Sequence, residues 1–280
     1  MALPYDQIGM VIMFRKLMGL YAEGDLARLL MEAALKRLSS YSKLDVIIVG
    51  AGPSGLSAAW HLSKTGLKVL VIERMLGIGG GIRGGAMLLP AALVEEGEAA
   101  DMLRNAGVEL TELSDGIYSV DPTEAMVKVA ARALEAGASI WPGVVVEDLL
   151  IKRTGRRTVR VRGVVINFTP IIEAEWHVDP LFLESKAVVD STGHDTDVVK
   201  ILAKRCPWLG VEVPGVSSLD VWRGEEEVVD YTGKIIDGLY AAGMSVSEIY
   251  NLHRMGPLLG GMLLSGKRVA EQIIRDLSKE

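Results

Sequence analysis

The sequence predicts an α/β fold in which strands and helices alternate along the chain. In residues 44–74, "LDVIIVGAGPSGLSAAWHLSKTGLKVLVIER", a buried strand, a glycine turn, a helix and a second apolar strand follow one another. This is the composition and length of a βαβ unit. Further strands and helices alternate towards the C-terminus. No linker, low-complexity tract or repeat interrupts the 280 residues, so we expect one domain over residues 1–280.

The N-terminal segment has a helical pattern. Apolar residues recur at three- and four-residue spacing over residues 8–40, which predicts a helix, or two helices divided at Gly24-Asp25. The segment is amphipathic and rich in methionine, and we interpret it as a contact between subunits. Arg15 and Lys16 interrupt the apolar run too early for a membrane span or a secretory signal.

The other expected elements follow the βαβ unit, whose helix ends at Gly66. They are a glycine-dense loop at 77–90, an amphipathic helix at 122–140 with Gly137 near its C-cap, strands at 141–151, 157–168 and 186–190, and a closing helix at 256–277. The strands in the middle of the chain are expected to be insertions into the sheet.

Composition narrows the function. A net charge of −6 disfavours general binding to nucleic acid, because phosphate binding depends on clustered Lys and Arg. The basic stretch 152–162 is interpreted as a hairpin with a solvated face, with an RNA-binding patch as the alternative. The single cysteine, Cys206, cannot form an internal disulfide, so a reducing cytoplasm is the simplest setting.

The turn after the first strand carries a dinucleotide fingerprint. Gly50, Gly52 and Gly55 fit G-x-G-x-x-G between a strand and a helix, and Glu73 ends the next strand. The glycines permit a tight turn, close approach to a pyrophosphate and close helix–strand packing. The helix N-terminus binds phosphate, and the acid accepts hydrogen bonds from a ribose diol. A Rossmann-like fold that binds an ADP-containing ligand is therefore predicted.

The fingerprint does not separate FAD from NAD. A late segment, "DGLYAAGM" at 237–244, resembles the second fingerprint of flavoproteins with a glutathione-reductase-like fold. By analogy of fold alone, an FAD-dependent oxidoreductase is one interpretation.

A few polar residues stand out beside this turn. His177 and Asp179 lie two apart before Pro180, so they share one face if the segment is extended. His194 follows a strand end in "STGHD". These residues could bind a divalent metal. An equally good interpretation is that they are loop residues that hydrogen-bond to local backbone, with Asp179 as a cap. Arg254 is either a residue that binds a small carboxylate or a surface charge that flanks a helix. His61, inside the first helix, is interpreted as a helix-surface or packing residue.

Five segments together resemble the thiamine thiazole synthase family in its archaeal, sulfide-dependent branch. In order they are "VIIVGAGPSGLSAAWHL", "GGGIRGGAMLLP", "WHVDPLFLESKAVVDSTGHD", "GLYAAGM" and "HRMGPLLGGMLLSGK". The first is shared with many flavoproteins, and the "HVDP", "TGHD" and "RMGP" motifs are more specific. The resemblance covers residues 30 to 275.

This resemblance implies a flavoprotein-like fold that uses NAD as a substrate. Nicotinamide is lost, and the ADP-ribose is rebuilt with glycine and sulfur into an ADP-linked thiazole carboxylic acid for thiamine biosynthesis. The family implies a transferase of the pentosyltransferase class that needs Fe(II). It also implies a homo-octamer in which neighbouring subunits share sites, with no nucleic-acid partner.

The resemblance also assigns roles to residues. Asp179 and His194 match the Fe(II) ligands, and Arg254 matches the residue that holds the glycine carboxylate. The expected dinucleotide contacts, beyond the three fingerprint glycines, are Ser54, Glu73, Arg74, Gly81, Val145, His177, Val178, Asp179 and Met244.

His177 occupies the place where fungal and plant relatives carry a cysteine that gives up its own sulfur. Cys206 lies outside any matching motif. The resemblance therefore implies free sulfide as the sulfur donor and multiple turnovers. Ile82-Arg83 depart from relatives that often carry an aromatic residue there. The remaining alternatives are the FAD oxidoreductase and a nucleotide-binding or metal-storing protein without turnover.

Overall fold

The computed structural model describes residues 20–279. The chain divides into two units, of which the first ends at Ser42 and the second begins at Lys43. In the first unit, helix α2 runs without a break from Glu23 to Ser40. Gly24 and Asp25 lie in its first turn, where the Asp25 carboxylate accepts the Ala22 N–H at 3.2 Å. Residues 20–22, just before the helix, are not helical, so the helical pattern is interrupted within a few residues of the expected division. Residues 8–19 of the expected helix lie outside the described residues.

Helix α2 carries a set of exposed apolar side chains. They are Leu26, Leu29, Leu30, Met31, Leu35 and Leu38. Exposed apolar side chains of this number are typical of a helix that packs against another surface, and the subunit contact expected for residues 1–40 stays a prediction. None of the described helices is long and apolar enough to cross a membrane.

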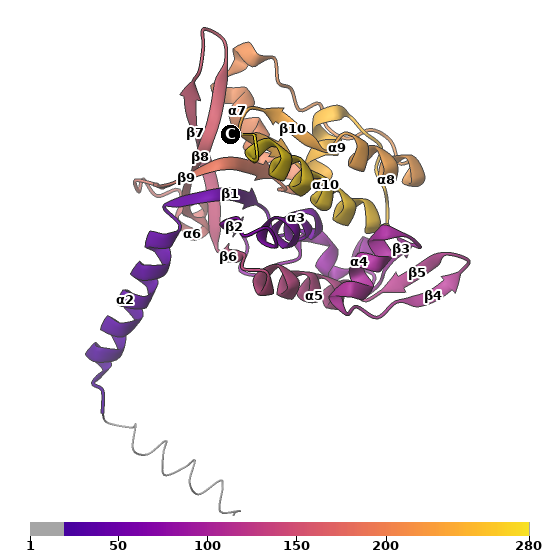
Figure 1. Ribbon diagram of the computed structural model, residues 1–280, viewed down its shortest axis with the longest axis horizontal. Coiled ribbons are helices and arrows are strands. Elements are labelled where there is room, and N and C mark those ends of the chain that lie inside the picture. The colour runs from indigo at the N-terminus through magenta and orange to yellow at the C-terminus, as the bar shows by residue number, and fades with distance from the viewer. Residues whose placement is uncertain (1–19, 280) are drawn as a thin grey trace, which may run out of the picture. The chain divides into compact units, whose positions relative to one another are not determined.

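The second unit is built on a mixed sheet (Figure 1). Its main path runs in the order β10 (Gly233–Ile236), β11 (Leu239–Ala241), β9 (Leu181–Asp190), β1 (Lys43–Val49), β2 (Val69–Glu73) and β6 (Ser139–Pro142). From β11 to β6 neighbouring strands are parallel, and β10 is antiparallel to β11. This parallel core confirms the predicted Rossmann-like α/β class.

Two antiparallel insertions complete the strands. The first is the hairpin of β7 (Val144–Arg153) and β8 (Val159–Phe168), which joins the sheet through antiparallel pairing of β8 with β9. The hairpin predicted for the basic stretch 152–162 is thereby confirmed. The second insertion is a separate sheet of β3 (Ala92–Glu95), β5 (Ile117–Val120) and β4 (Thr111–Ser114).

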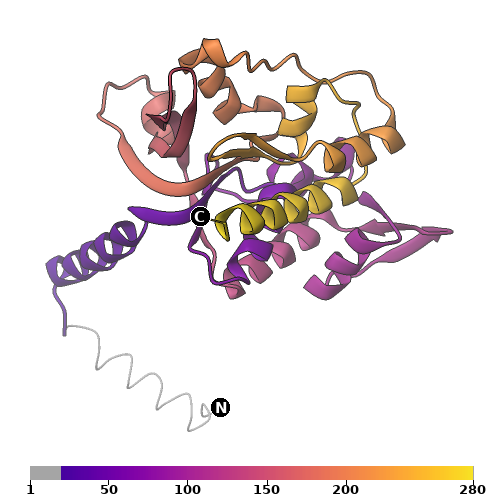
Figure 2. The same cartoon turned by 45° about the horizontal axis from the view of Figure 1, so that its top comes forward.

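The helices connect these strands. In chain order they are α3 (Pro53–Ser63), α4 (Glu98–Ala106), α5 (Pro122–Glu135), α6 (Thr169–Glu173), α7 (Asp197–Arg205), α8 (Val221–Asp230), α9 (Met244–Tyr250) and α10 (Gly260–Leu277). Helix α3 lies between α5 and α10 and packs on β1 and β2 (Figures 1 and 2). Helix α7 packs on β7 and β9.

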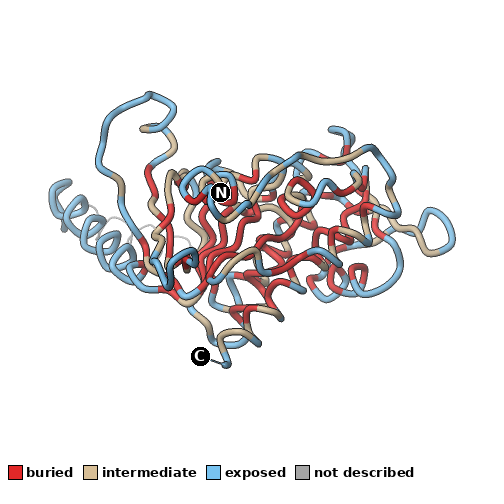
Figure 3. Tube along the Cα trace, turned by 90° about the horizontal axis from the view of Figure 1, so that it is seen from above, coloured by how far each residue is buried: buried red, intermediate tan, exposed pale blue. Residues whose placement is uncertain are grey.

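Both faces of the central strands are buried. Val46 and Ile48 of β1 join the core formed with α3, and Ile47, between them, is also fully buried. Figure 3 shows the buried residues concentrated in these strands and the helices packed on them. Burial on both faces explains why the strands are continuous apolar runs in the sequence rather than alternating ones.

The strand order fixes where a ligand can bind. From β1 the chain continues to β2 on one side, whereas β9 lies on the other side of β1. A crevice forms outside the carboxyl ends of parallel strands where the order reverses in this way. The loops after Val49 and Asp190, which are opposite each other in the β1–β9 register, therefore flank the expected crevice.

A buried carboxyl group holds the start of α10. One Glu225 oxygen, Oε1, accepts the Gly261 N–H at 2.5 Å, and the other, Oε2, has no hydrogen-bond partner among the described residues. Burial, with a smaller contribution from the nearby Glu95 and against the hydrogen bond from Gly261, raises the pKa of the Glu225 carboxyl to about 7. The folded protein therefore favours the protonated form of this group near neutrality.

This raised pKa predicts a specific dependence of stability on pH. Because the folded pKa lies above the unfolded value of 4.5, the folded state binds more protons than the unfolded state between the two values. Glu225 therefore destabilises the fold progressively as pH rises from about 4.5 to 7, by up to ~1.4 kcal/mol per pH unit. Glu225→Gln should remove that slope from the free energy of unfolding in urea. The exposed Glu226→Gln is the control, and parallel pH profiles for wild type and Glu225→Gln would contradict the assignment.

Candidate functional site

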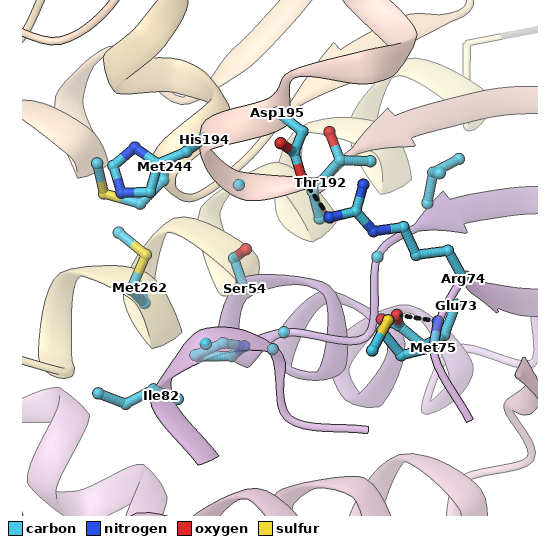
Figure 4. Close-up of a pocket in the computed structure, with 18 of the residues that line it drawn as sticks. Ser54, Glu73, Arg74, Met75, Ile82, Thr192, His194, Asp195, Met244 and Met262 are labelled. Atoms are coloured by element: carbon cyan, nitrogen blue, oxygen red, sulfur yellow. Dashed lines mark hydrogen bonds and ion pairs between the residues drawn. The ribbon is translucent and has the colours of Figure 1, made fainter. Parts of the chain in front are cut away.

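A cavity of about 890 Å³ opens at the carboxyl ends of the parallel strands. Figure 4 shows His194, Met244 and Met262 towards one end and Glu73, Arg74 and Met75 towards the other, with Ser54 between them. The predicted residues that line it are Gly50, Gly52, Ser54, Glu73, Arg74, Gly81, Val145, His194, Met244 and Arg254. The fold thus gathers residues from the whole length of the second unit around one space.

The glycine turn forms the floor of this cavity. Gly50 has φ +103°, and a Cβ there would lie 2.3 Å from the Ser191 carbonyl oxygen. Gly55 does not line the cavity. A Cβ on Gly55 would lie 2.0 Å from the Gly50 carbonyl oxygen, so this glycine serves the packing of α3 on the turn. The first N–H groups of α3 have no partner within the helix and are free for an anion.

Glu73 closes the turn from the side of β2. Its side chain is buried, and its two oxygens accept the N–H groups of Ala51 and Met75, each at 2.8 Å. Each carboxylate oxygen retains a second lone pair, which is available to the ribose diol expected from the sequence. The same residue therefore holds the turn in place, a role that the fingerprint did not indicate.

The guanidinium group of Arg74 is paired within the cavity wall. It lies 2.6 Å from the Asp195 carboxylate and 3.7 Å from that of Asp197, and Figure 4 shows the Arg74–Asp195 contact. Burial raises the pKa of the Asp197 carboxyl, and the neighbouring Asp195 adds to this shift. The two carboxylates fix the direction of Arg74 and offset its charge.

The loop that carries His194 is anchored by Asp190. This carboxylate is fully buried at the end of β9. It accepts hydrogen bonds from the N–H and hydroxyl of Thr192, from the Val199 N–H and from the Ser245 hydroxyl, at 2.7–3.0 Å. A charge that is fully bonded in this way holds its partners firmly, because losing a partner leaves it uncompensated. The loop, the start of α7 and α9 are thereby fixed together.

His194 itself has one ring nitrogen engaged. Its Nδ1 lies 2.7 Å from Oε1 of Glu248, whose side chain is buried on α9. The rest of the imidazole is exposed and contributes to the cavity wall (Figure 4). One nitrogen, Nε2, remains available to a ligand.

Arg254 lies in the loop that leads to α10. Its backbone N–H donates to the Ser218 carbonyl at 3.1 Å, and the residue lines the cavity. No described carboxylate forms an ion pair with its guanidinium group, in contrast to Arg74. Of the two interpretations of Arg254, this position fits a binding site for a carboxylate better than a helix-flanking charge, because the charge borders the cavity.

His177, Val178 and Asp179 do not line the cavity. They lie in an exposed loop after α6, and β9 begins only at Leu181. Asp179 caps no described helix, so the capping role is wrong, but the position of these residues in a loop agrees with that interpretation. The loop is held by Asn167, whose side-chain amide donates to the Val178 carbonyl at 3.2 Å. Within the described residues, no group of three or more His, Cys, Asp or Glu side chains could hold a metal ion.

Most of the other residues named from the sequence lie away from the cavity. Ile82 contributes to the cavity wall, whereas Arg83 does not. His61 is part-buried on α3, where Nδ1 lies 2.8 Å from the Ser57 carbonyl oxygen, as expected for a packing residue. Cys206 is buried outside the cavity, and burial raises the pKa of its thiol.

Sequence reasoning missed Asp190 and Glu248. Each is a single acidic residue whose partners come from other elements, so spacing along the chain gave no signal for either. The one available hint was the position of Asp190 at the end of a buried strand, where a charged residue needs donors.

Comparison with known proteins agrees with this geometry. Residues 27–259 match the model of the Thi4 family. The chain is 47% identical over 257 residues to the thiamine thiazole synthase of Saccharolobus islandicus, covering 92% of this chain and 95% of the relative. It is 46% identical over 255 residues to that of Pyrobaculum arsenaticum, covering 91% and 96%.

A solved structure is also similar. The crystal structure of Thermovibrio ammonificans THI4 matches with a TM-score of 0.87 and 39% identity, over 92% of this chain and 99% of that one. A family match over most of the chain, together with these identities, establishes the assignment. The chain belongs to the Thi4 family.

Proposed function

We propose that this protein is an enzyme that makes the thiazole unit of thiamine. The observation that carries the proposal is the cavity in which a dinucleotide turn, His194 and Arg254 meet. Membership of the Thi4 family and the thiamine thiazole synthase relatives support it. In this family's reaction NAD loses nicotinamide, and the ADP-ribose part is rebuilt with glycine and sulfur into an ADP-linked thiazole carboxylic acid.

The elements of the cavity have matching tasks. The glycine turn and the N-terminus of α3 bind the pyrophosphate, and Glu73 accepts hydrogen bonds from the adenosine ribose. Arg254 holds the carboxylate of glycine through charge-assisted hydrogen bonds. Apolar side chains such as Met244 and Met262 line the cavity and keep water from the reacting atoms.

The sulfur donor in this proposal is free sulfide. His177 stands where a self-sacrificing relative has a cysteine, and Cys206 is buried outside the cavity. Neither position offers a thiol to the reacting atoms. The protein would then act over many turnovers as a pentosyltransferase-class enzyme in the cytoplasm.

We also propose an Fe(II) site made by His194 and Asp179. His194 has a free imidazole nitrogen at the cavity, and imidazole with carboxylate is a donor set that suits Fe(II). Bound Fe(II) would supply a Lewis acid and an orienting centre with open positions. The chain's own contribution is to orient the imidazole of His194 at the cavity.

Sharing of this site between subunits follows from the proposal. Asp179 lies on an exposed loop outside the cavity, and no described three-residue metal cluster exists in one chain. A neighbouring copy would therefore supply the carboxylate. Trp176 on the same loop and Phe182 at the start of β9 are also exposed, and large apolar side chains of this kind are typical of an interface. A homo-octamer, as in the family, is the assembly we propose.

An FAD-dependent oxidoreductase is the second candidate. One observation favours it: β11 is parallel to β9 and leads the chain back to the cavity at Met244, as the second fingerprint of flavoproteins does. A yellow protein with bound flavin would support this candidate.

The first test is reconstitution. Protein purified without oxygen is incubated with NAD, glycine, sulfide and Fe(II), and adenylated products are followed by mass spectrometry. We expect an ADP-thiazole product formed in excess of the enzyme. Arg254→Gln should raise the KM for glycine roughly tenfold or more while NAD binding is retained, because one charged pair is lost. Intact NAD without a thiazole adduct would contradict the proposal.

The second test addresses the shared site. His194→Ala and Asp179→Ala should each lower turnover by roughly 100-fold or more, because each removes a metal donor. When the two variants are co-expressed with different tags and purified as mixed oligomers, about a quarter of the sites should combine both intact residues. Activity should return to about that fraction. No recovery in verified mixed oligomers would show that the two residues act within one chain or not at all.

A further inference from the structure

We propose that Glu248 is a positioning residue that presents Nε2 of His194 to the metal. The inference rests on the proposed metal site and adds a residue that supports it from behind. Glu248 lies on α9 and contacts the imidazole of His194, which lies in the turn that follows β9. The two residues are 54 positions apart in the sequence and meet only through the fold.

The contact is short and shielded from water on one side. His194 Nδ1 lies 2.7 Å from Glu248 Oε1, and the exposed fraction of the Glu248 side chain is 11%. The His194 side chain, in contrast, is 61% exposed and lines the cavity. The ring therefore has one edge that faces the buried Glu248 carboxylate, and the rest of the side chain is exposed at the cavity.

This arrangement selects one form of the imidazole. An ionised carboxylate only accepts hydrogen bonds, so it favours the tautomer with the proton on Nδ1. The lone pair is then on Nε2, at the open edge of the ring. A carboxylate behind a metal-bound histidine fixes the orientation of the ring and strengthens it as a donor.

Helix α9 is itself tied to the loop of His194. Ser245, one turn before Glu248 on the helix, donates to Asp190 at 3.0 Å and to the Gly193 carbonyl at 3.2 Å. On its other side, the Glu248 carbonyl accepts the Gly215 N–H at 3.0 Å. Both the backbone beside His194 and its ring are thus held from the same helix, as a precise donor position requires.

The chain offers a matched pair for comparison. His253 Nδ1 lies 3.0 Å from Oε2 of Glu227, so this is also a histidine–glutamate contact. His253 does not line the cavity. Removal of Glu227 therefore tests the loss of a similar contact without a role at the cavity.

The experiment measures binding of Co(II), a spectroscopic substitute for Fe(II), by equilibrium dialysis without oxygen. The full-length oligomer is compared as wild type, Glu248→Ala, Glu248→Gln and Glu227→Ala. We expect Glu248→Ala to weaken Co(II) binding roughly 10- to 100-fold. Glu248→Gln, which keeps a neutral acceptor at the same length, should lose less, and Glu227→Ala should bind as wild type does.

Thermal unfolding without metal provides a second measurement. If the contact with His194 served stability alone, Glu248→Ala would lower the melting temperature and leave Co(II) affinity unchanged, which would overturn the inference. Equal loss of affinity in Glu227→Ala would overturn it as well. If Glu248→Ala does not fold, Glu248→Asp withdraws the carboxylate by one methylene and should show the same loss.

A different result would identify failure of the proposed function itself. If wild type does not bind Co(II), or if His194→Ala binds it as well as wild type does, the metal site is wrong and the positioning role is wrong with it. If wild type binds Co(II) and His194→Ala does not, the response of the Glu248 variants decides the inference alone.

Discussion

The buried carboxylate of Asp190 holds the edge of the sheet on which the site is built. Asp190 ends β9 beside Val49, the last residue of β1, so it sits where the dinucleotide turn begins. An uncompensated charge there would be costly, and four hydrogen bonds from Thr192, Val199 and Ser245 compensate it. Those bonds set the loop that carries His194, the start of α7 and the position of α9. The glycine turn packs directly against this loop, because Gly50 leaves no room for a Cβ beside Ser191. The glycine turn and the imidazole are therefore held in one rigid arrangement.

Much of this fold could be predicted from local patterns. The apolar runs of β1 and β2, the glycines between them and the acid at Glu73 are contiguous in sequence, and each has a direct physical role. What could not be predicted depends on tertiary packing. Glu248 is an ordinary helix residue until α9 brings it to His194, and Glu225 becomes buried only where α8 meets α10. The expected division at Gly24-Asp25 lies close to the start of α2 at Glu23, where Asp25 caps the first turn through the Ala22 N–H.

Within one chain, some of the site residues are held by internal hydrogen bonds and others lie on an exposed loop. The turn, Glu73, Arg74 and the His194 loop are tied by internal hydrogen bonds, whereas Asp179 lies on an exposed loop. In the proposed site, the preorganised half would hold the nucleotide and present one nitrogen, and a second copy would complete the donor set. The placement of His177 on the same loop would then keep a position used by cysteine in self-sacrificing relatives close to the reaction, but without sulfur to give.

The most direct measurement is the identity of the adenylate that remains bound when the protein is purified without oxygen. The protein is denatured and the released small molecules are analysed by mass spectrometry and absorbance. We predict NAD-derived nucleotides, with an ADP-linked thiazole among them, and no flavin absorbance. Stoichiometric FAD in place of these nucleotides would contradict the central claim that the cavity binds NAD as a substrate for thiazole synthesis.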